Sequence, residues 1–198
     1  MILGLVSAFF LIKTPIKPMA SFHETVEIAK RLKMFLCDVD GVLTDGGIIL
    51  DGIEGEYKRF DVQDGLGIAM IRQAGLIAGI ITGRKSGVVK RRAEEIKFDE
   101  ICQGFFWKEE ALEQLLDKHQ LRESQIAYIG DDLLDIPVLR RVGLPIAVQN
   151  ARPEVKASSL YTSSASGGHG AVREIVEWIL QLRNQKQEIL DHFTKSRE

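Results

Sequence analysis

Short apolar runs that alternate with helical segments constrain the fold of this chain more than any other feature of its sequence. Four of these runs have the length and composition of buried strands: Met34–Val39, Ile77–Thr82, Glu100–Gln103 and Ile126–Ile129. Strands without a polar face must be covered on both sides, which is typical of parallel sheets whose strands are joined by helices. The sequence therefore predicts an α/β fold with a parallel sheet between helical layers.

The segments between these runs supply the helices, a hairpin and a further strand. Two strands, Ile48–Leu50 and Tyr57–Val62, flank a turn-forming stretch and are expected to form a β-hairpin. A further strand is expected at Ile146–Val148. The expected helices are one capped by Asp64 that runs to Gln73 before Gly75, then Ser86–Ile96, Lys108–His119, Leu133–Arg141 with Pro137 near its first turn, and Ala171–Leu182.

The length of 198 residues favours a single domain. We expect this domain to occupy residues 21–182, followed by a polar tail at 183–198 that forms a frayed helix end. Residues 1–20 are an apolar extension, too short to span a bilayer as a helix and without the basic start of a signal peptide. Our hypothesis is that translation begins at Met19 and that residues 1–18 reflect a mis-assigned start. A weak membrane anchor is the alternative.

Composition limits the partners of this chain. Hydrophobic residues make up 45% and charged residues 27%, which is ordinary for a soluble globular protein. The formal net charge of -2 gives no strong field toward nucleic acid or an anionic membrane, so neither is an expected partner. The two cysteines, Cys37 and Cys102, lack zinc-site spacing and are predicted to be reduced, buried thiols of a cytoplasmic protein.

Polar residues and glycines follow each of the four apolar runs. The four segments are Asp38-Val39-Asp40, Thr82-Gly83-Arg84, Gln103-Gly104 and Gly130-Asp131-Asp132. Open parallel sheets bind ligands at the carboxyl ends of their strands. The sequence therefore predicts that these segments share one site.

The acidic residues among them predict a metal site. Asp38 and Asp40 are two positions apart and project to the same side of an extended chain. Their mutual repulsion is relieved by a hard divalent cation, and Mg²⁺ prefers such oxygen ligands. A solvated turn or a helix cap is the alternative for this pair alone. We predict that Asp131 also binds the metal, that Asp132 caps the next helix, and that Asp135 supports the metal ligands without binding the ion.

Four further residues suit a phosphate group. The Thr82 hydroxyl and backbone N–H groups such as that of Gly83, at a helix start, suit an oxyanion, and Arg84 can form a bidentate pair with phosphate. Lys108 begins a helix, and its charge can neutralise both a nucleophile and a phosphoryl group. An ordinary helix start and a solvated lysine are the alternatives if each is considered alone.

Together these motifs resemble, in content and order, the haloacid dehalogenase superfamily of phosphotransferases. The matching parts are the DxDG motif at Asp38 and Asp40, Thr82, Lys108, and the GDDxxD stretch from Gly130 to Asp135. A narrower similarity is to the capless sugar-acid phosphate phosphatases of this superfamily. It covers the chain from about Met34 to about Leu180 and rests on residues 37–46, 60–67, 80–85 and 167–174.

The resemblance implies a capless Rossmann-like three-layer α/β/α domain with a β-hairpin insert at Ile48–Val62, assembled as a homotetramer. It implies a Mg²⁺-dependent phosphomonoesterase that hydrolyses an eight-carbon sugar acid phosphate in the synthesis of lipopolysaccharide precursors. A phosphatase of another sugar acid phosphate, such as a nine-carbon one, and a non-catalytic domain of the same fold are the alternatives.

The resemblance also implies a role for each matching residue. Asp38 would be the nucleophile, Asp40 the general acid and base, and Thr82 and Lys108 would hold phosphoryl oxygens. The metal ligands would be Asp38, the Asp40 carbonyl and Asp131, and the substrate-binding residues would be Asp40, Gly83 and Arg84.

Three positions depart from the pattern of those phosphatases. The loop before Lys108 reads Phe105-Phe106-Trp107 where polar residues are expected, and Gln63 and His169 stand where arginine is common. All three positions are expected near the substrate-binding rim. We expect the aromatic side chains to pack at a subunit interface.

Overall fold

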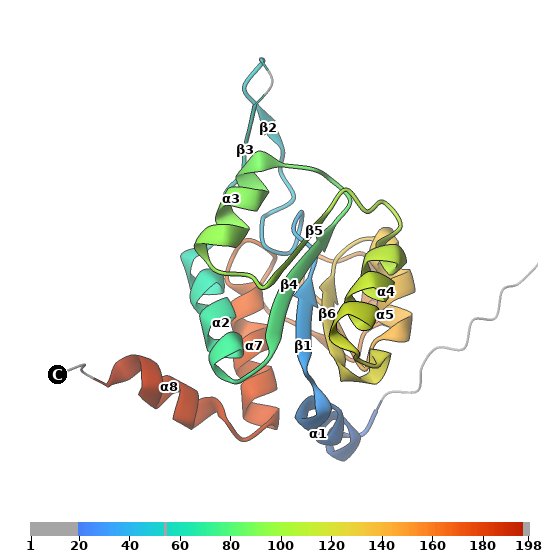
Figure 1. Ribbon diagram of the computed structural model, residues 1–198, viewed down its shortest axis with the longest axis vertical. Coiled ribbons are helices and arrows are strands. Elements are labelled where there is room, and N and C mark those ends of the chain that lie inside the picture. The colour runs from blue at the N-terminus through green and yellow to red at the C-terminus, as the bar shows by residue number, and fades with distance from the viewer. Residues whose placement is uncertain (1–19, 54, 196–198) are drawn as a thin grey trace, which may run out of the picture.

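The computed structural model describes residues 20–53 and 55–195, and its centre is a six-stranded sheet in the order β5-β4-β1-β6-β7-β8 (Figure 1). Every neighbouring pair of strands is parallel. The strands are β1 (Met34–Cys37), β4 (Ile77–Thr82), β5 (Glu100–Gln103), β6 (Ile126–Gly130), β7 (Leu144–Ala147) and β8 (Tyr161–Thr162). The parallel sheet confirms the predicted fold class.

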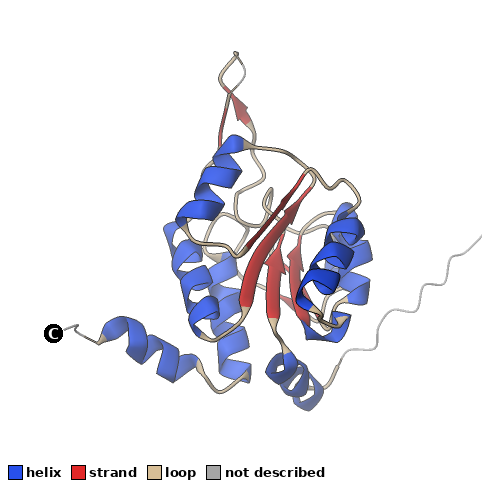
Figure 2. Ribbon diagram, in the orientation of Figure 1, coloured by secondary structure: helices blue, strands red, loops and turns tan. Residues whose placement is uncertain are grey.

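Helices cover both faces of the sheet and complete the three-layer arrangement (Figure 2). On one face α2 packs against α7, and on the other α4 packs against α5. The helices are α1 (Phe22–Arg31), α2 (Val62–Gln73), α3 (Gly87–Glu95), α4 (Lys108–His119), α5 (Ile136–Arg141), α6 (Pro153–Ala157), α7 (Ala171–Leu182) and α8 (Lys186–Thr194), with 3₁₀ turns η1 (Glu123–Gln125) and η2 (Leu133–Asp135). Because both faces are covered, all of β1 is buried. Among the described residues no separate cap domain is present.

The predicted hairpin is present and projects beyond the carboxyl edge of the sheet (Figure 1). Its strands, β2 (Ile49–Leu50) and β3 (Glu56–Tyr57), are antiparallel and shorter than predicted. The prediction of a strand to Val62 is wrong because Asp61 caps α2 through a 2.7 Å hydrogen bond from the Gln63 N–H. The prediction that Asp64 caps this helix is wrong for the same reason.

Asp64 instead ties α2 to α7. Its side chain accepts a 2.9 Å hydrogen bond from the backbone N–H of Arg173, one of the N–H groups that a helix start leaves unpaired. Asp64 is 1% exposed, and this burial raises the pKa of its carboxyl group to about 6. The two helices approach closely here because Gly67 lies against the backbone of Arg173.

Replacing Asp64 with asparagine is expected to change how stability depends on pH. The folded-state pKa of about 6 lies above the unfolded value of about 3.9, so stability is lost as the pH rises through 6. Asparagine keeps an acceptor for Arg173 and has no charge. The unfolding free energy of the variant minus that of the wild type should therefore rise by about 1.4 kcal/mol from pH 5 to pH 8. Urea denaturation at both pH values measures this difference, and a constant difference would contradict the prediction.

Other elements differ from the sequence prediction at their ends. The strand expected at Ile146–Val148 is β7, which begins two residues earlier than predicted. The predicted helix at Leu133–Arg141 is divided into η2 and α5. The tail is not a frayed helix end: Asn184 adopts a φ of 56° and separates α7 from a distinct helix, α8. Five elements were not predicted: α1, η1, α6, β8 and α8.

Residues 1–18 lie outside the described residues, so the translation start at Met19 stays a prediction. Among the described residues, no helix is both long and apolar enough to cross a membrane. Cys37 and Cys102 are both free thiols, as predicted, although Cys102 is only partly buried.

Candidate active site

The predicted site residues come together at the carboxyl edge of the sheet. Asp38 follows β1, Thr82 ends β4, Lys108 begins α4 and Asp131 follows β6. These side chains line one cavity of about 360 Å³. The full lining is Asp38, Asp40, Gly46, Thr82, Gly83, Arg84, Lys108, Asp131, Asp132, Leu134 and Asp135. The cavity thus contains every residue for which a catalytic, substrate-binding or metal-binding role was expected.

Lys108 lies at the centre of the buried charges. It is only 3% exposed, which excludes the alternative of a solvated lysine. Its ammonium Nζ lies 2.9 Å from Asp38 Oδ2 and 2.5 Å from Asp135 Oδ1. Burial alone would lower the pKa of Lys108, but the two carboxylates outweigh it and raise the pKa above its usual value. The lysine is therefore a permanent positive charge beside Asp38.

Asp38 is buried, with 7% of its surface exposed. Burial raises the pKa of its carboxyl group to about 7, and the charge of Lys108 limits this rise. Its Oδ1 accepts a 2.6 Å hydrogen bond from the Val39 N–H. This leaves Asp38 held between a backbone donor and an ammonium group, with its carboxylate at the cavity.

Asp135 is fully buried, and all of its acceptor capacity faces protein donors. Oδ1 accepts from Lys108 and, at 2.6 Å, from the Tyr128 hydroxyl. Oδ2 accepts from the backbone N–H groups of Asp131 and Asp132 at 2.9 and 3.1 Å. These contacts fit the expected supporting role, because Asp135 fixes the loop that carries Asp131 and has little capacity left for a metal ion. Asp132 accepts from the Leu133 N–H and caps η2, as expected.

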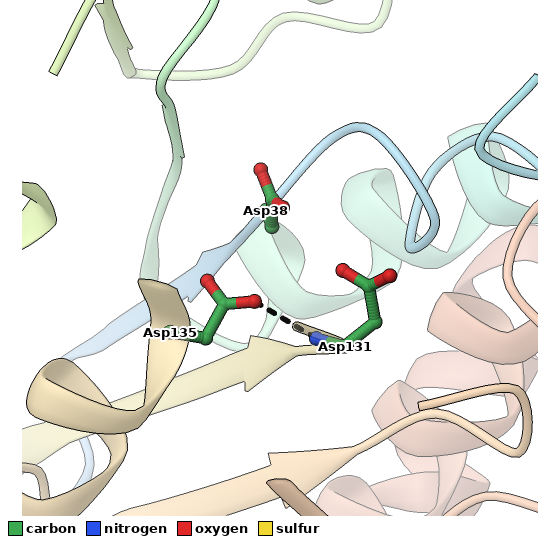
Figure 3. A group of neighbouring side chains, drawn as sticks. All are labelled: Asp38, Asp131 and Asp135. Carbon is green, nitrogen blue, oxygen red and sulfur yellow. Dashed lines mark hydrogen bonds between the residues drawn. The ribbon is translucent and has the colours of Figure 1, made fainter. Parts of the chain in front are cut away.

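Asp131 points toward the same space as Asp38 and Asp135 (Figure 3). One oxygen from each of the three carboxylates lies within 4.8 Å of the others. Among the described residues, the buried Oδ1 of Asp131 has no hydrogen-bond partner. Burial, followed by the charges of Asp38 and Asp135, raises the pKa of Asp131 to about 8. An unpaired buried oxygen beside a second carboxylate, with only oxygen ligands nearby, fits a hard cation such as Mg²⁺.

Gly41 explains why glycine follows the two aspartates of the motif. Its φ is +92°, and a Cβ atom there would lie 2.1 Å from Asp131 Oδ2. Any side chain would therefore push Asp131 away from Asp38. The glycine keeps open the space in which the two carboxylates meet.

The residues after β4 differ from the expected helix start. The next helix, α3, begins at Gly87 and is capped by Ser86, so Gly83 is not in its first turn. Thr82 is 2% exposed and its hydroxyl accepts a 3.4 Å hydrogen bond from the Arg84 N–H. The Arg84 guanidinium lies 2.9 Å from Glu56 Oε2 and 3.8 Å from Asp40 Oδ2. Arg84 thus reaches the site from the side of the hairpin.

Two residues of the site region were not identified from the sequence. Lys58, just after β3, forms an ion pair with Asp40. The Asn150 side chain donates to the Gly41 carbonyl at 3.0 Å and accepts from the Gly167 N–H at 2.7 Å. Asn150 thereby joins the loop after β1 to the glycine-rich segment before α7. Only the two-residue spacing of Glu56 and Lys58 in an extended segment offered a signal for the hairpin residues.

The fold and this site define a class of protein. A family model described as haloacid dehalogenase-like hydrolase matches residues 97–175. Together with the relatives described next, this match shows that the chain belongs to the haloacid dehalogenase-like hydrolases.

Within that family the chain is similar to 3-deoxy-D-manno-octulosonate 8-phosphate phosphatases. It is 38% identical to the Yersinia pestis phosphatase over 157 residues, which cover 79% of this chain and 84% of the relative. It is 36% identical to the Escherichia coli K12 phosphatase over 165 residues, covering 83% and 88%. The crystal structure of the Moraxella catarrhalis phosphatase, in complex with a magnesium ion, a phosphate ion and a KDO molecule, matches with a TM-score of 0.84 and 42% identity, covering 88% of this chain and 100% of that one.

Proposed function

We propose that this chain is a Mg²⁺-dependent phosphatase that hydrolyses 3-deoxy-D-manno-octulosonate 8-phosphate to the free sugar acid and inorganic phosphate, in the cytoplasm. The observation that supports this most is the meeting of the buried Asp38 carboxylate and the partly buried Asp131 carboxylate with the buried ammonium of Lys108 in one cavity. Relatives that cover most of the chain are named for this activity. The cavity of about 360 Å³ is within the usual size of small-molecule sites.

Asp38 acts as the nucleophile in this proposal. One of its carboxylate oxygens bonds to phosphorus while the bond from phosphorus to the sugar oxygen breaks, which gives an aspartyl-phosphate. Asp40 donates a proton to the departing sugar oxygen. It then takes a proton from the water that cleaves the aspartyl-phosphate and releases inorganic phosphate. Asp38 suits the role of nucleophile because the positive charge of Lys108 offsets the negative charge of its carboxylate. This lowers the repulsion between the carboxylate and the approaching phosphate group.

The other residues of the cavity bind and orient the phosphoryl group and the sugar. Thr82 and Lys108 contact the phosphoryl oxygens, and the Gly83 backbone and Arg84 bind the substrate. Mg²⁺, held by Asp38, the Asp40 carbonyl and Asp131, would supply positive charge opposite the phosphoryl oxygens. The domain responsible occupies residues 21–182.

Phosphate release from 3-deoxy-D-manno-octulosonate 8-phosphate tests the proposal directly. Purified protein should release inorganic phosphate with Mg²⁺ and lose this activity when a chelator is added. A nine-carbon sugar acid phosphate, assayed in parallel, tests the substrate. Equal or faster hydrolysis of the nine-carbon ester would overturn the substrate assignment, and activity that persists in chelator would overturn the metal assignment.

Replacing Asp131 with asparagine is expected to raise the stability of the metal-free protein and to abolish its stabilisation by Mg²⁺. In chelator the variant lacks the repulsion between Asp131 and Asp38, so its melting temperature should exceed that of the wild type by about 2–4 °C. Added Mg²⁺ should raise the melting temperature of the wild type and not that of the variant. Asp132→Asn, which makes the same charge change one residue further on, should keep the Mg²⁺ response. An unchanged Mg²⁺ response in Asp131→Asn would exclude this residue as a ligand.

The exposed hairpin supports a homotetramer. Ile49, Leu50, Ile53 and Tyr57 are each more than 60% exposed, an unusual concentration of apolar surface for an isolated subunit. Phe106 and Trp107 are 57% and 58% exposed and stay candidates for the same subunit interface. Light scattering at micromolar concentration measures the oligomeric state, and a monomeric mass would contradict the proposed tetramer.

A further inference from the structure

Lys58 carries a charge in a place where charge is costly. It lies directly after β3, in the base of the hairpin, and its side chain is 0% exposed. Removing an ammonium group from water is strongly unfavourable unless a close counter-charge compensates. The compensating group is Asp40, whose Oδ1 forms an ion pair with the Lys58 Nζ. Lys58 can therefore stay buried only while the Asp40 carboxylate points toward it.

Asp40 is held from a second side as well. Its Oδ2 lies 3.8 Å from Arg84 Nε, and the Arg84 guanidinium is in turn fixed by Glu56 at 2.9 Å. Glu56 and Lys58 are two positions apart, so both project to the same side of the extended chain, toward the cavity. The hairpin thus contributes one direct contact to Asp40 and one through Arg84.

The position of Asp40 in the chain leaves its side chain free to rotate unless other residues hold it. It is 21% exposed at the cavity, and the chain turns immediately after it at Gly41, whose φ is +92°. A general acid has to lie within hydrogen-bond reach of the atom that it protonates. A displacement of about 1 Å can lower the rate about 10²-fold. A partly exposed carboxylate at a turn meets this requirement only if something fixes its torsion angles.

We propose that Lys58 is a positioning residue for the phosphatase reaction, which holds the Asp40 carboxyl group toward the oxygen of the leaving group. This inference rests on the proposed function and extends it to the hairpin. Lys58 pairs with Asp40 and is not among the residues that line the cavity, so its effect on catalysis passes through the acid. The hairpin then serves the active site of its own subunit.

The dependence of the rate on the leaving group separates this role from a structural one. Departure of a sugar alkoxide needs protonation, whereas p-nitrophenolate leaves without an acid. The value of kcat/KM reports the steps up to departure of the leaving group. In Lys58→Met it should fall about 100-fold for 3-deoxy-D-manno-octulosonate 8-phosphate and less than about threefold for p-nitrophenyl phosphate. Lys30→Met, which removes an exposed lysine of α1 at the opposite end of the sheet, should change neither value (Figure 1).

Equal losses for both esters, or no loss for the sugar phosphate, would overturn the positioning role. Lys58→Gln carries the same assays if Lys58→Met does not fold. Crystal structures of the wild type and a Lys58 variant give a readout independent of activity, because the Asp40 carboxyl group should rotate in the variant. If the wild type hydrolyses neither ester, the proposed function fails. The crystal structures then decide the positioning role. An Asp40 side chain that keeps its orientation in the Lys58 variant would overturn it.

Discussion

Replacing Asp38 with asparagine is expected to lower kcat by about 10⁴-fold or more. The reason is chemical: an amide oxygen cannot form the bond to phosphorus that a carboxylate forms, and none of the other cavity residues takes over that role in the proposed mechanism. Phosphate release with Mg²⁺ measures the loss, and rapid quenching followed by mass spectrometry should detect a phosphorylated wild-type enzyme. The variant should give no such species.

The same substitution should leave the protein folded. Asp38 is buried and its pKa is raised to about 7, so its negative charge destabilises the apo protein. Asparagine removes this charge. Asparagine keeps an acceptor for the Val39 N–H, and Lys108 keeps its contact with Asp135. Urea denaturation in chelator should therefore show no loss of stability. Asp117→Asn, the same change at an exposed position of α4, is the matched control and should keep full activity.

Residual activity in Asp38→Asn needs one further control, because deamidation of asparagine regenerates aspartate. Asp38→Ala excludes this route. A rate within about 100-fold of the wild type in both variants would refute the nucleophile assignment, since no carboxylate would then be available at this position.

The parts of the site that were predictable from the sequence depend on local pattern. Apolar runs ending in polar residues locate the strand ends after β1, β4 and β6, and the topology of a parallel sheet brings those ends to one edge. The sequence also predicts that Asp131, the residue nearest the strand end, binds the metal and that Asp135 supports it, and this division stays a prediction. The structure adds the donors that saturate Asp135.

The contacts that were not predicted join residues far apart in the chain. Lys58 lies 18 positions from Asp40, and Asn150 lies 109 positions from Gly41. Nothing in the composition of either segment distinguishes a buried lysine from a solvated one, or a bridging asparagine from a turn residue. The confusion of Asp61 with Asp64 has a similar cause. Both precede a helical pattern, and only the position of α7 decides that Asp64 faces inward.

Replacing Lys108 with methionine is expected to cost both activity and stability. Methionine has a similar length but no charge, so Asp135 would stay fully buried without a cation partner and Asp38 would lose its nearest positive charge. Breaking a buried ion pair by removing one partner costs about 3–5 kcal/mol. The loss of a charge beside the phosphoryl group should lower kcat by a further factor of about 10²–10³.

A second substitution separates these two effects. In Lys108→Met with Asp135→Asn, the unpaired buried charge is gone, and an asparagine can still accept from the Asp131 and Asp132 N–H groups. Stability in urea should therefore recover in part, while kcat should not recover, because the positive charge beside Asp38 is still missing. Lys118→Met, on the same helix, is the control: that lysine is 61% exposed, and loss of its surface pair with Glu100 should cost at most about 1 kcal/mol.

The outcome of the double variant decides what Lys108 does. If stability and activity recover together, the lysine acts by neutralising Asp135 and so by keeping the Asp131 loop in place. If only stability recovers, its contribution to the reaction is its charge beside Asp38. The geometry favours the second result, because Asp135 is also fixed by the Tyr128 hydroxyl and two backbone N–H groups, whereas Lys108 is the cation that contacts Asp38 among the described ion pairs.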